Sequence, residues 1–108
     1  MSKKRDNGLG ERCRNRSHGI TEADNLFAEA KESQARAEVT GLNAFWLQAA
    51  GLFARAARFY RQSNLGLSAR ESYLLAAECH EGAANTDEAK RCKAYAKAIQ
   101  EYWEGNHE

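Results

Sequence analysis

The sequence predicts an all-α fold of three or four antiparallel helices, arranged as helical hairpins or a small bundle. Proline, which breaks helices, is absent from the chain. Alanine, the residue that loses least on entering a helix, makes up roughly a fifth of the residues. No segment shows the alternation of β-branched and polar residues that is typical of a strand. These three observations together favour helices throughout.

The length and composition are those of one small soluble domain. The chain has 108 residues, of which 43% are hydrophobic and 29% are charged. A domain this short is only marginally stable alone, so contact with a partner would stabilise it. The longest nearly apolar run, residues 42–57, is too short to span a bilayer and is interrupted by Asn43, Gln48 and Arg55. No apolar segment of the signal-peptide kind follows the basic N-terminus.

The cysteines predict a reducing environment. Their number is odd, with Cys13, Cys79 and Cys92, and no signal segment is recognised. An odd count of this kind argues for reduced thiols in a cytoplasm and against a disulfide framework. On helix faces, Cys79 and Cys92 are expected to pack as small hydrophobic side chains.

Charge is distributed unevenly along the chain and divides it into three parts. The net charge is +1, but residues 1–20 hold six basic and two acidic side chains, a balance of +4. Almost no apolar side chain is present there to offset the entropy of ordering. We therefore predict a disordered basic tail over residues 1–19, a helical domain over 20–104 and a short C-terminal tail over 105–108. The basic residues of the first part are Lys3, Lys4, Arg5, Arg12, Arg14 and Arg16.

The first helix is predicted from about Glu22 to Val39. Thr21 is its expected N-cap, because a threonine hydroxyl oxygen there can accept a hydrogen bond from an unpaired backbone N–H of the first turn. Gly41 is its expected end, because glycine readily adopts the left-handed conformation that closes a helix. Its apolar stripe consists of Ala23, Leu26, Phe27, Ala30 and Ala37.

The second helix is predicted from about Asn43 to Ser63 and is the most apolar. Apolar residues cover more than half of its circumference, so it should contact other helices on at least two sides. Its polar edge carries Arg55, Arg58 and Arg61 at three-residue spacing. The apolar residues are Leu42, Phe45, Trp46, Ala49, Leu52, Phe53, Ala56, Ala57, Phe59 and Tyr60.

Two shorter helices should follow. Ser68 with Glu71 three residues later forms the pattern of a capping box, which predicts a helix that runs to about Glu81. The fourth helix is predicted from about Asn85, with Gly105 and Asn106 ending it. The short links between these helices predict that neighbours in the chain pack antiparallel.

Seven residues within 53–81 fall on the offsets of a known helical repeat. They are Phe53, Ala56, Ala57, Tyr60, Ala69, Tyr73 and Ala76, and Glu81 stands where that pattern has proline. This segment resembles the tetratricopeptide class of helical hairpins and, similarly, the hairpin arrays of soluble NSF attachment proteins. The resemblance implies a surface that binds peptides or other proteins. No ligand-binding residue is carried over, because the positions with which the family holds its ligands have no counterpart here.

The aromatic side chains are the candidate partner-binding residues. A bundle of this size has difficulty burying all of them, and an exposed apolar patch usually forms an interface. The chain is therefore expected to be a non-catalytic protein–protein interaction module, whose partner is another protein or a second copy of itself. The candidate residues are Phe45, Trp46, Phe59, Tyr102 and Trp103.

The alternative is a small protein associated with nucleic acid. The basic tail could neutralise several phosphates, and the arginine row of the second helix could add more. The same arginines could instead pair with acidic residues of the first helix if the two helices lie antiparallel. The candidate residues are Arg12, Arg14, Arg16, Arg55, Arg58 and Arg61.

The sequence offers little to support catalysis or a metal site. Cys79, His80 and Cys92 are the only cysteine and histidine residues in the predicted helices, and their spacing matches no common zinc pattern. No nucleophile elbow, phosphate-binding loop or dinucleotide-binding glycine pattern is present. We therefore expect no enzymatic activity, no cofactor, no small-molecule substrate and no membrane association.

Overall fold

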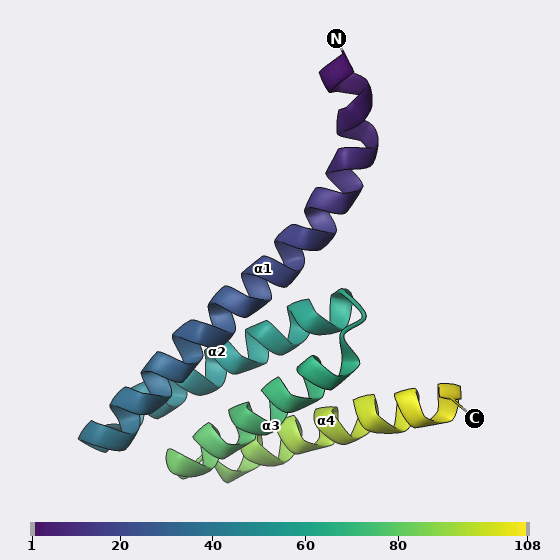
Figure 1. The fold of residues 1–108 in the computed structure, drawn as a ribbon. Coiled ribbons are helices and arrows are strands. Elements are labelled where there is room, and N and C mark those ends of the chain that lie inside the picture. The colour runs from purple at the N-terminus through teal and green to yellow at the C-terminus, as the bar shows by residue number, and fades with distance from the viewer. Residues whose placement is uncertain (1, 108) are drawn as a thin grey trace.

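The computed structural model confirms the all-α prediction. It describes the backbone of residues 2–107 and the side chains of residues 19–103. In this part of the chain there are four helices, α1 (Ser2–Thr40), α2 (Asn43–Gln62), α3 (Gly66–Gly82) and α4 (Thr86–His107). Each helix packs on the next one in the chain. Figure 1 shows them side by side in chain order, with the N-terminal part of α1 extending past the end of α2.

Left-handed residues end the first three helices. Gly41, with a φ of 71°, follows α1 and donates its N–H to the carbonyl of Ala37 at 2.7 Å. This confirms the predicted end of the first helix, because the conformation costs glycine little.

The links after α2 and after α3 have the same geometry. Asn64 has a φ of 62° and Ala84 has a φ of 60°. The next N–H in each case reaches back five residues, from Leu65 to Tyr60 at 2.8 Å and from Asn85 to His80 at 2.7 Å. This is the Schellman motif, and it turns the chain within three residues so that consecutive helices lie antiparallel.

Small residues dominate the core. Phe53 is the largest side chain that is fully buried, and its ring meets the edge of Phe27 with the centroids 5.3 Å apart. Because alanine has a single methyl group, the helix backbones approach closely and a few rings fill the remaining space. The buried alanines are Ala23, Ala30, Ala37, Ala49, Ala50, Ala56, Ala57, Ala69, Ala76, Ala77, Ala89 and Ala96.

A glycine at each end of α3 receives a tryptophan from a neighbouring helix. A Cβ at Gly66 would overlap the indole of Trp103, which comes from α4. At the other end, a Cβ at Gly82 would lie 2.7 Å from Cδ2 of Trp46, which comes from α2. Both indoles therefore pack directly on glycine backbone, an approach that any side chain at these two positions would prevent.

Several predicted helix ends are corrected. Thr21 lies inside α1 and is not its N-cap, since the helix begins at Ser2. The capping box at Ser68 is also wrong, because α3 begins at Gly66 with Leu65 as its N-cap and without a side-chain cap. The Schellman turn fixes Leu65 at that place, so the helix starts two residues before the serine can act.

Helical backbone extends into both predicted tails. The backbone of α1 is helical over residues 2–19, where a disordered tail was predicted, and α4 continues to His107, past Gly105 and Asn106. A helix closes its hydrogen bonds within itself, so its backbone can continue without a packed face. The side chains of residues 1–18 and 104–108 lie outside the described part, so the division into a basic tail, a helical domain and a C-terminal tail stays a prediction.

Candidate functional site

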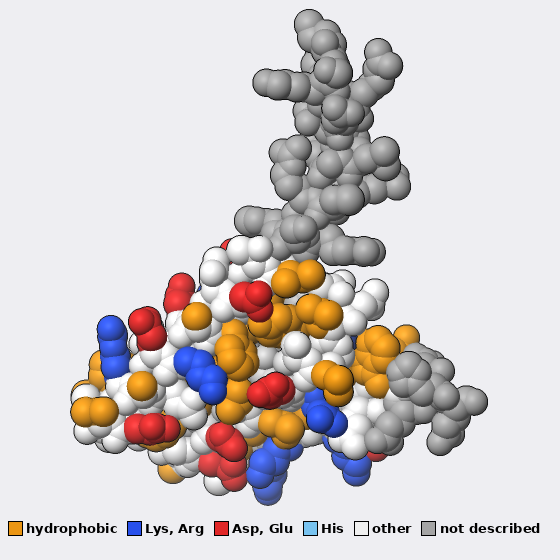
Figure 2. All heavy atoms as spheres, viewed as in Figure 1, with side chains coloured by type: hydrophobic (Ala, Val, Ile, Leu, Met, Phe, Trp, Pro, Cys, Tyr) orange, Lys and Arg blue, Asp and Glu red, His pale blue; other side chains and the backbone are white. Residues whose placement is uncertain are grey.

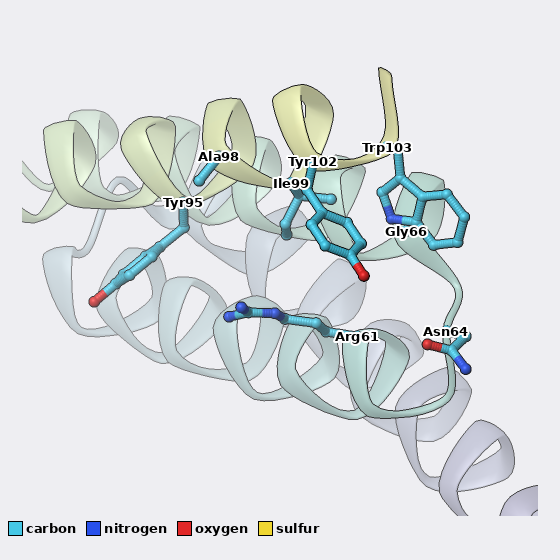
Figure 3. Close-up of a pocket in the computed structure, with 8 residues that line it drawn as sticks. All are labelled: Arg61, Asn64, Gly66, Tyr95, Ala98, Ile99, Tyr102 and Trp103. Carbon is cyan, nitrogen blue, oxygen red and sulfur yellow. The ribbon is translucent and has the colours of Figure 1, made fainter. Parts of the chain in front are cut away.

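A pocket of about 580 Å³ lies between the C-terminal parts of α2 and α4. We call it the α2–α4 groove. One of its lining residues, Gly66, belongs to α3, which separates the two helices. Figure 3 shows the aromatic side chains of α4 on one wall and Arg61 of α2 facing them. The lining residues are Arg61, Asn64, Gly66, Tyr95, Ala98, Ile99, Tyr102 and Trp103.

Helical spacing places the aromatic wall. Tyr95 and Tyr102 are seven residues apart on α4, so they stand two turns apart on one face. They are 52% and 66% exposed, so both rings are open to solvent. Trp103 is half-buried against Gly66, and its ring lies 6.1 Å from that of Tyr102 at an interplanar angle of 89°. The groove thus combines the ring of Trp103 with two accessible tyrosine rings, and the Tyr95 ring also packs on that of Tyr73, with centroids 5.2 Å apart.

Positive charge lies on the α2 side of the groove. Arg61 is exposed and belongs to the last turn of α2, and Arg58 stands one turn earlier. Burial raises the pKa of the Cys92 thiol on α4, and Glu88 adds to this, whereas the positive charge of Arg58 opposes it. Arg58 is thus close enough to α4 for its charge to act on Cys92. The carboxylate of Glu88 is paired with Arg91 at 3.0 Å.

Carboxylates of α1 and α3 act on two buried side chains, Tyr60 and Cys79. Tyr60 donates its hydroxyl to Asp24 at 2.5 Å, and the pKa of Tyr60 is raised by burial, by this bond and by the charges of Asp24 and Glu71. In α3, burial raises the pKa of the Cys79 thiol to about 12, and the charges of Glu78 and Glu38 add to the effect. Lys31 opposes them. Figure 2 shows acidic and basic side chains interspersed over the face that it draws, so these carboxylates are local neighbours of Tyr60 and Cys79.

The structure separates the five predicted partner-binding aromatics. Tyr102 and Trp103 line the α2–α4 groove. Trp46 is half-buried against Gly82, at the opposite end of α3. Phe59 is half-buried against the core, and Phe45 is half-buried in the first turn of α2. Only two of the five therefore share a site.

The arginine row remains accessible. Arg55, Arg58 and Arg61 are all exposed, and over residues 19–103 none of them forms an ion pair with an acidic residue of α1. The side chains of Arg12, Arg14 and Arg16 lie outside the described part. The pairing of the row with the first helix, which the sequence left open, is therefore absent in the described side chains.

Tyr95, Asn64 and Gly66 are groove residues that the sequence interpretation did not identify. A signal for Tyr95 was present, because it precedes Tyr102 by two helical turns, beside the apolar stripe and not within it. Asn64 and Gly66 are placed by the turn after α2, so no periodicity could have pointed to them.

The described residues contain neither a cluster of metal ligands nor a helix that could span a membrane. Over those residues, no three His, Cys, Asp or Glu side chains are grouped so that they could hold a metal ion. Among the described helices, none combines the length and the apolar character needed to cross a membrane.

Comparisons with known proteins return no similarity. No protein-family model, no curated protein and no solved structure matches the chain.

Proposed function

We propose that the protein is a non-catalytic interaction module that holds a segment of a partner protein in the α2–α4 groove. The observation that carries this proposal is the pocket of about 580 Å³ lined by Arg61, Tyr95, Tyr102 and Trp103. Tyrosine, tryptophan and arginine are the side chains that contribute most at protein interfaces. Accessible rings beside an anchored one offer apolar area at a small entropic cost.

The groove also provides polar groups. Asn64 offers an amide, Arg61 a guanidinium, and the two tyrosines their hydroxyls. A partner segment could thus bury an apolar side chain against the rings while its polar groups are satisfied. We also propose a cytoplasmic location, on the ground that Cys79 and Cys92 are free thiols.

The test is site-specific photo-crosslinking in cells of the source organism. A benzophenone amino acid replaces Tyr102 in the groove or, as a matched control, Leu74, which is 42% exposed on α3 and does not line the groove. We expect a discrete protein adduct from position 102 that survives nuclease treatment, and none from position 74. Equal labelling from both positions would count against the groove.

Association with nucleic acid is the second candidate, favoured by the exposure of Arg55, Arg58 and Arg61. Arginines beside accessible rings can grip phosphates and stack bases. This candidate predicts binding of a single-stranded oligonucleotide that weakens steeply with salt and is lost when residues 1–19 are removed. Binding that is indifferent to salt would rule it out.

A further inference from the structure

The arginine row and the groove form one continuous surface on α2. Arg61 lines the groove, and Arg58 is exposed one helical turn earlier on α2. Arg55 continues the row on the exposed face of the helix. A three-residue step rises about 4.5 Å and turns about 60° around a helix, so the row crosses α2 obliquely and ends in the groove.

The charge in the lining of the groove is positive. The groove is lined by Arg61 and by no acidic residue. The nearby carboxylate of Glu88 is already paired with Arg91. The carboxylates that act on Tyr60 and Cys79 belong to Asp24, Glu38, Glu71 and Glu78, which lie on α1 and α3 and do not line the groove. A ligand of the groove therefore meets the guanidinium of Arg61, and no acidic side chain of the lining neutralises it.

The spacing of the row fits acidic side chains on a helix. Neighbouring residues three or four apart on a helix have Cβ atoms about 5–6 Å apart. In an extended peptide, residues on one side recur at about 6.6 Å, twice the rise of a strand residue. Arg58 and Arg61 are themselves three residues apart on a helix, so their Cβ spacing matches that of side chains on a partner helix. An amphipathic helix can also lay its apolar stripe over Tyr95, Tyr102 and Trp103.

From these observations we infer that the occupant of the α2–α4 groove is an acidic amphipathic helix of a partner protein. Its carboxylates lie along Arg58 and Arg61, and an apolar side chain fills the pocket beside Trp103. This inference rests on the proposed function and names the chemistry of the partner. The chain's own acidic segment, residues 22–39 of α1, is a poor occupant, because its apolar stripe, including Ala23, Leu26 and Ala30, is already buried against α2.

The experiment uses the full chain and three synthetic 18-residue amphipathic peptides. The peptides share an apolar face of Leu and Phe, and their polar faces carry Glu, Gln or Lys. A 20-nucleotide oligo(dT) is the fourth probe. Dissociation constants are measured by fluorescence anisotropy at two salt concentrations. The indole N–H signals of Trp46 and Trp103 in ¹H–¹⁵N spectra report where each probe binds.

We expect the Glu peptide to bind about tenfold more tightly than the Gln peptide at low salt, and the Lys peptide to bind least. The Glu peptide should shift the Trp103 signal and leave the Trp46 signal unchanged. The Arg58→Gln/Arg61→Gln double variant should remove the preference for Glu over Gln. The matched control is Lys90→Gln/Lys97→Gln, which removes two exposed α4 charges outside the groove and should keep the preference.

The other outcomes separate the two claims. If the Glu and Gln peptides bind equally and shift Trp103, the groove binds protein but the acidic partner is wrong. If only the oligonucleotide binds, both the interaction module and the acidic partner are overturned in favour of nucleic acid. If no probe binds, or if the Glu peptide binds without shifting Trp103, the inference is overturned.

Discussion

The indole of Trp103 lies against the backbone of Gly66, in the space that a side chain at position 66 would occupy. This contact joins the C-terminal part of α4 to the first turn of α3 and fixes one wall of the α2–α4 groove. The ring of Trp46 makes the corresponding contact with Gly82 at the other end of α3. The two tryptophans thus hold α3 against its neighbours at both ends.

Gly66→Ala is expected to lower the free energy of unfolding by about 1–3 kcal/mol, because the new methyl group displaces the indole. Gly51→Ala is the matched control, since nothing lies within 4 Å of a Cβ at that exposed helical position. It should raise the free energy of unfolding by about 0.5–1 kcal/mol through helix propensity. Urea unfolding of both variants measures the contrast. Two changes of the same sign would contradict the contact.

Ala84→Gly is expected to stabilise the protein by about 1 kcal/mol. Ala84 holds a left-handed conformation, with a φ of 60°, that strains a residue with a Cβ. Glycine removes the strain, although its greater freedom in the unfolded chain offsets part of the gain. The melting temperature is the measurement, and Ala83→Gly, next to it but without positive φ, is the control and should destabilise.

Tyr60→Phe is expected to cost about 0.5–1.5 kcal/mol of stability, because it removes the hydrogen bond to Asp24 that joins α2 to α1. A double-mutant cycle with Asp24→Ala isolates this bond from other effects of each change. Additive losses in the two single variants and the double variant would mean that the two side chains are not coupled.

Stability should fall as the pH rises above 9. The pKa of Cys79 is raised from 9.0 to about 12, chiefly by burial, so the folded state favours the protonated thiol. The stabilisation is therefore complete below pH 9 and is lost progressively towards pH 12, by about 1.4 kcal/mol per pH unit. The raised pKa of Tyr60 adds a further loss above its ordinary value of 10.0.

Urea unfolding under reducing conditions from pH 7 to pH 11 measures this effect. Cys79→Ala removes one titrating group, so its stability should decline less steeply with pH than that of the parent chain. Identical slopes for the two proteins would show that Cys79 does not contribute.

The sequence alone determined much of the local structure. The apolar stripes predicted a helix in each of the four segments that the structure shows as helical, although α1 begins at Ser2 and not near Glu22. A period of 3.6 residues is a property of one helix and can be recognised without its neighbours. The end of α1 at Gly41 was also predictable, because the left-handed conformation of a glycine depends on the local backbone alone. Where two local signals competed, as at Ser68 and the turn before it, the sequence pattern predicted the wrong start.

The candidate site was decided by the tertiary structure. Tyr102 and Trp103 are adjacent in the sequence, yet one ring is exposed and the other is set against Gly66. Arg61 and Tyr95 share a pocket although they belong to α2 and α4, with the whole of α3 between them in the chain. Periodicity fixes the direction of each side chain around its own helix. Which neighbour stands in that direction depends on the packing of all four helices, because burial and charge arise between elements and not within one.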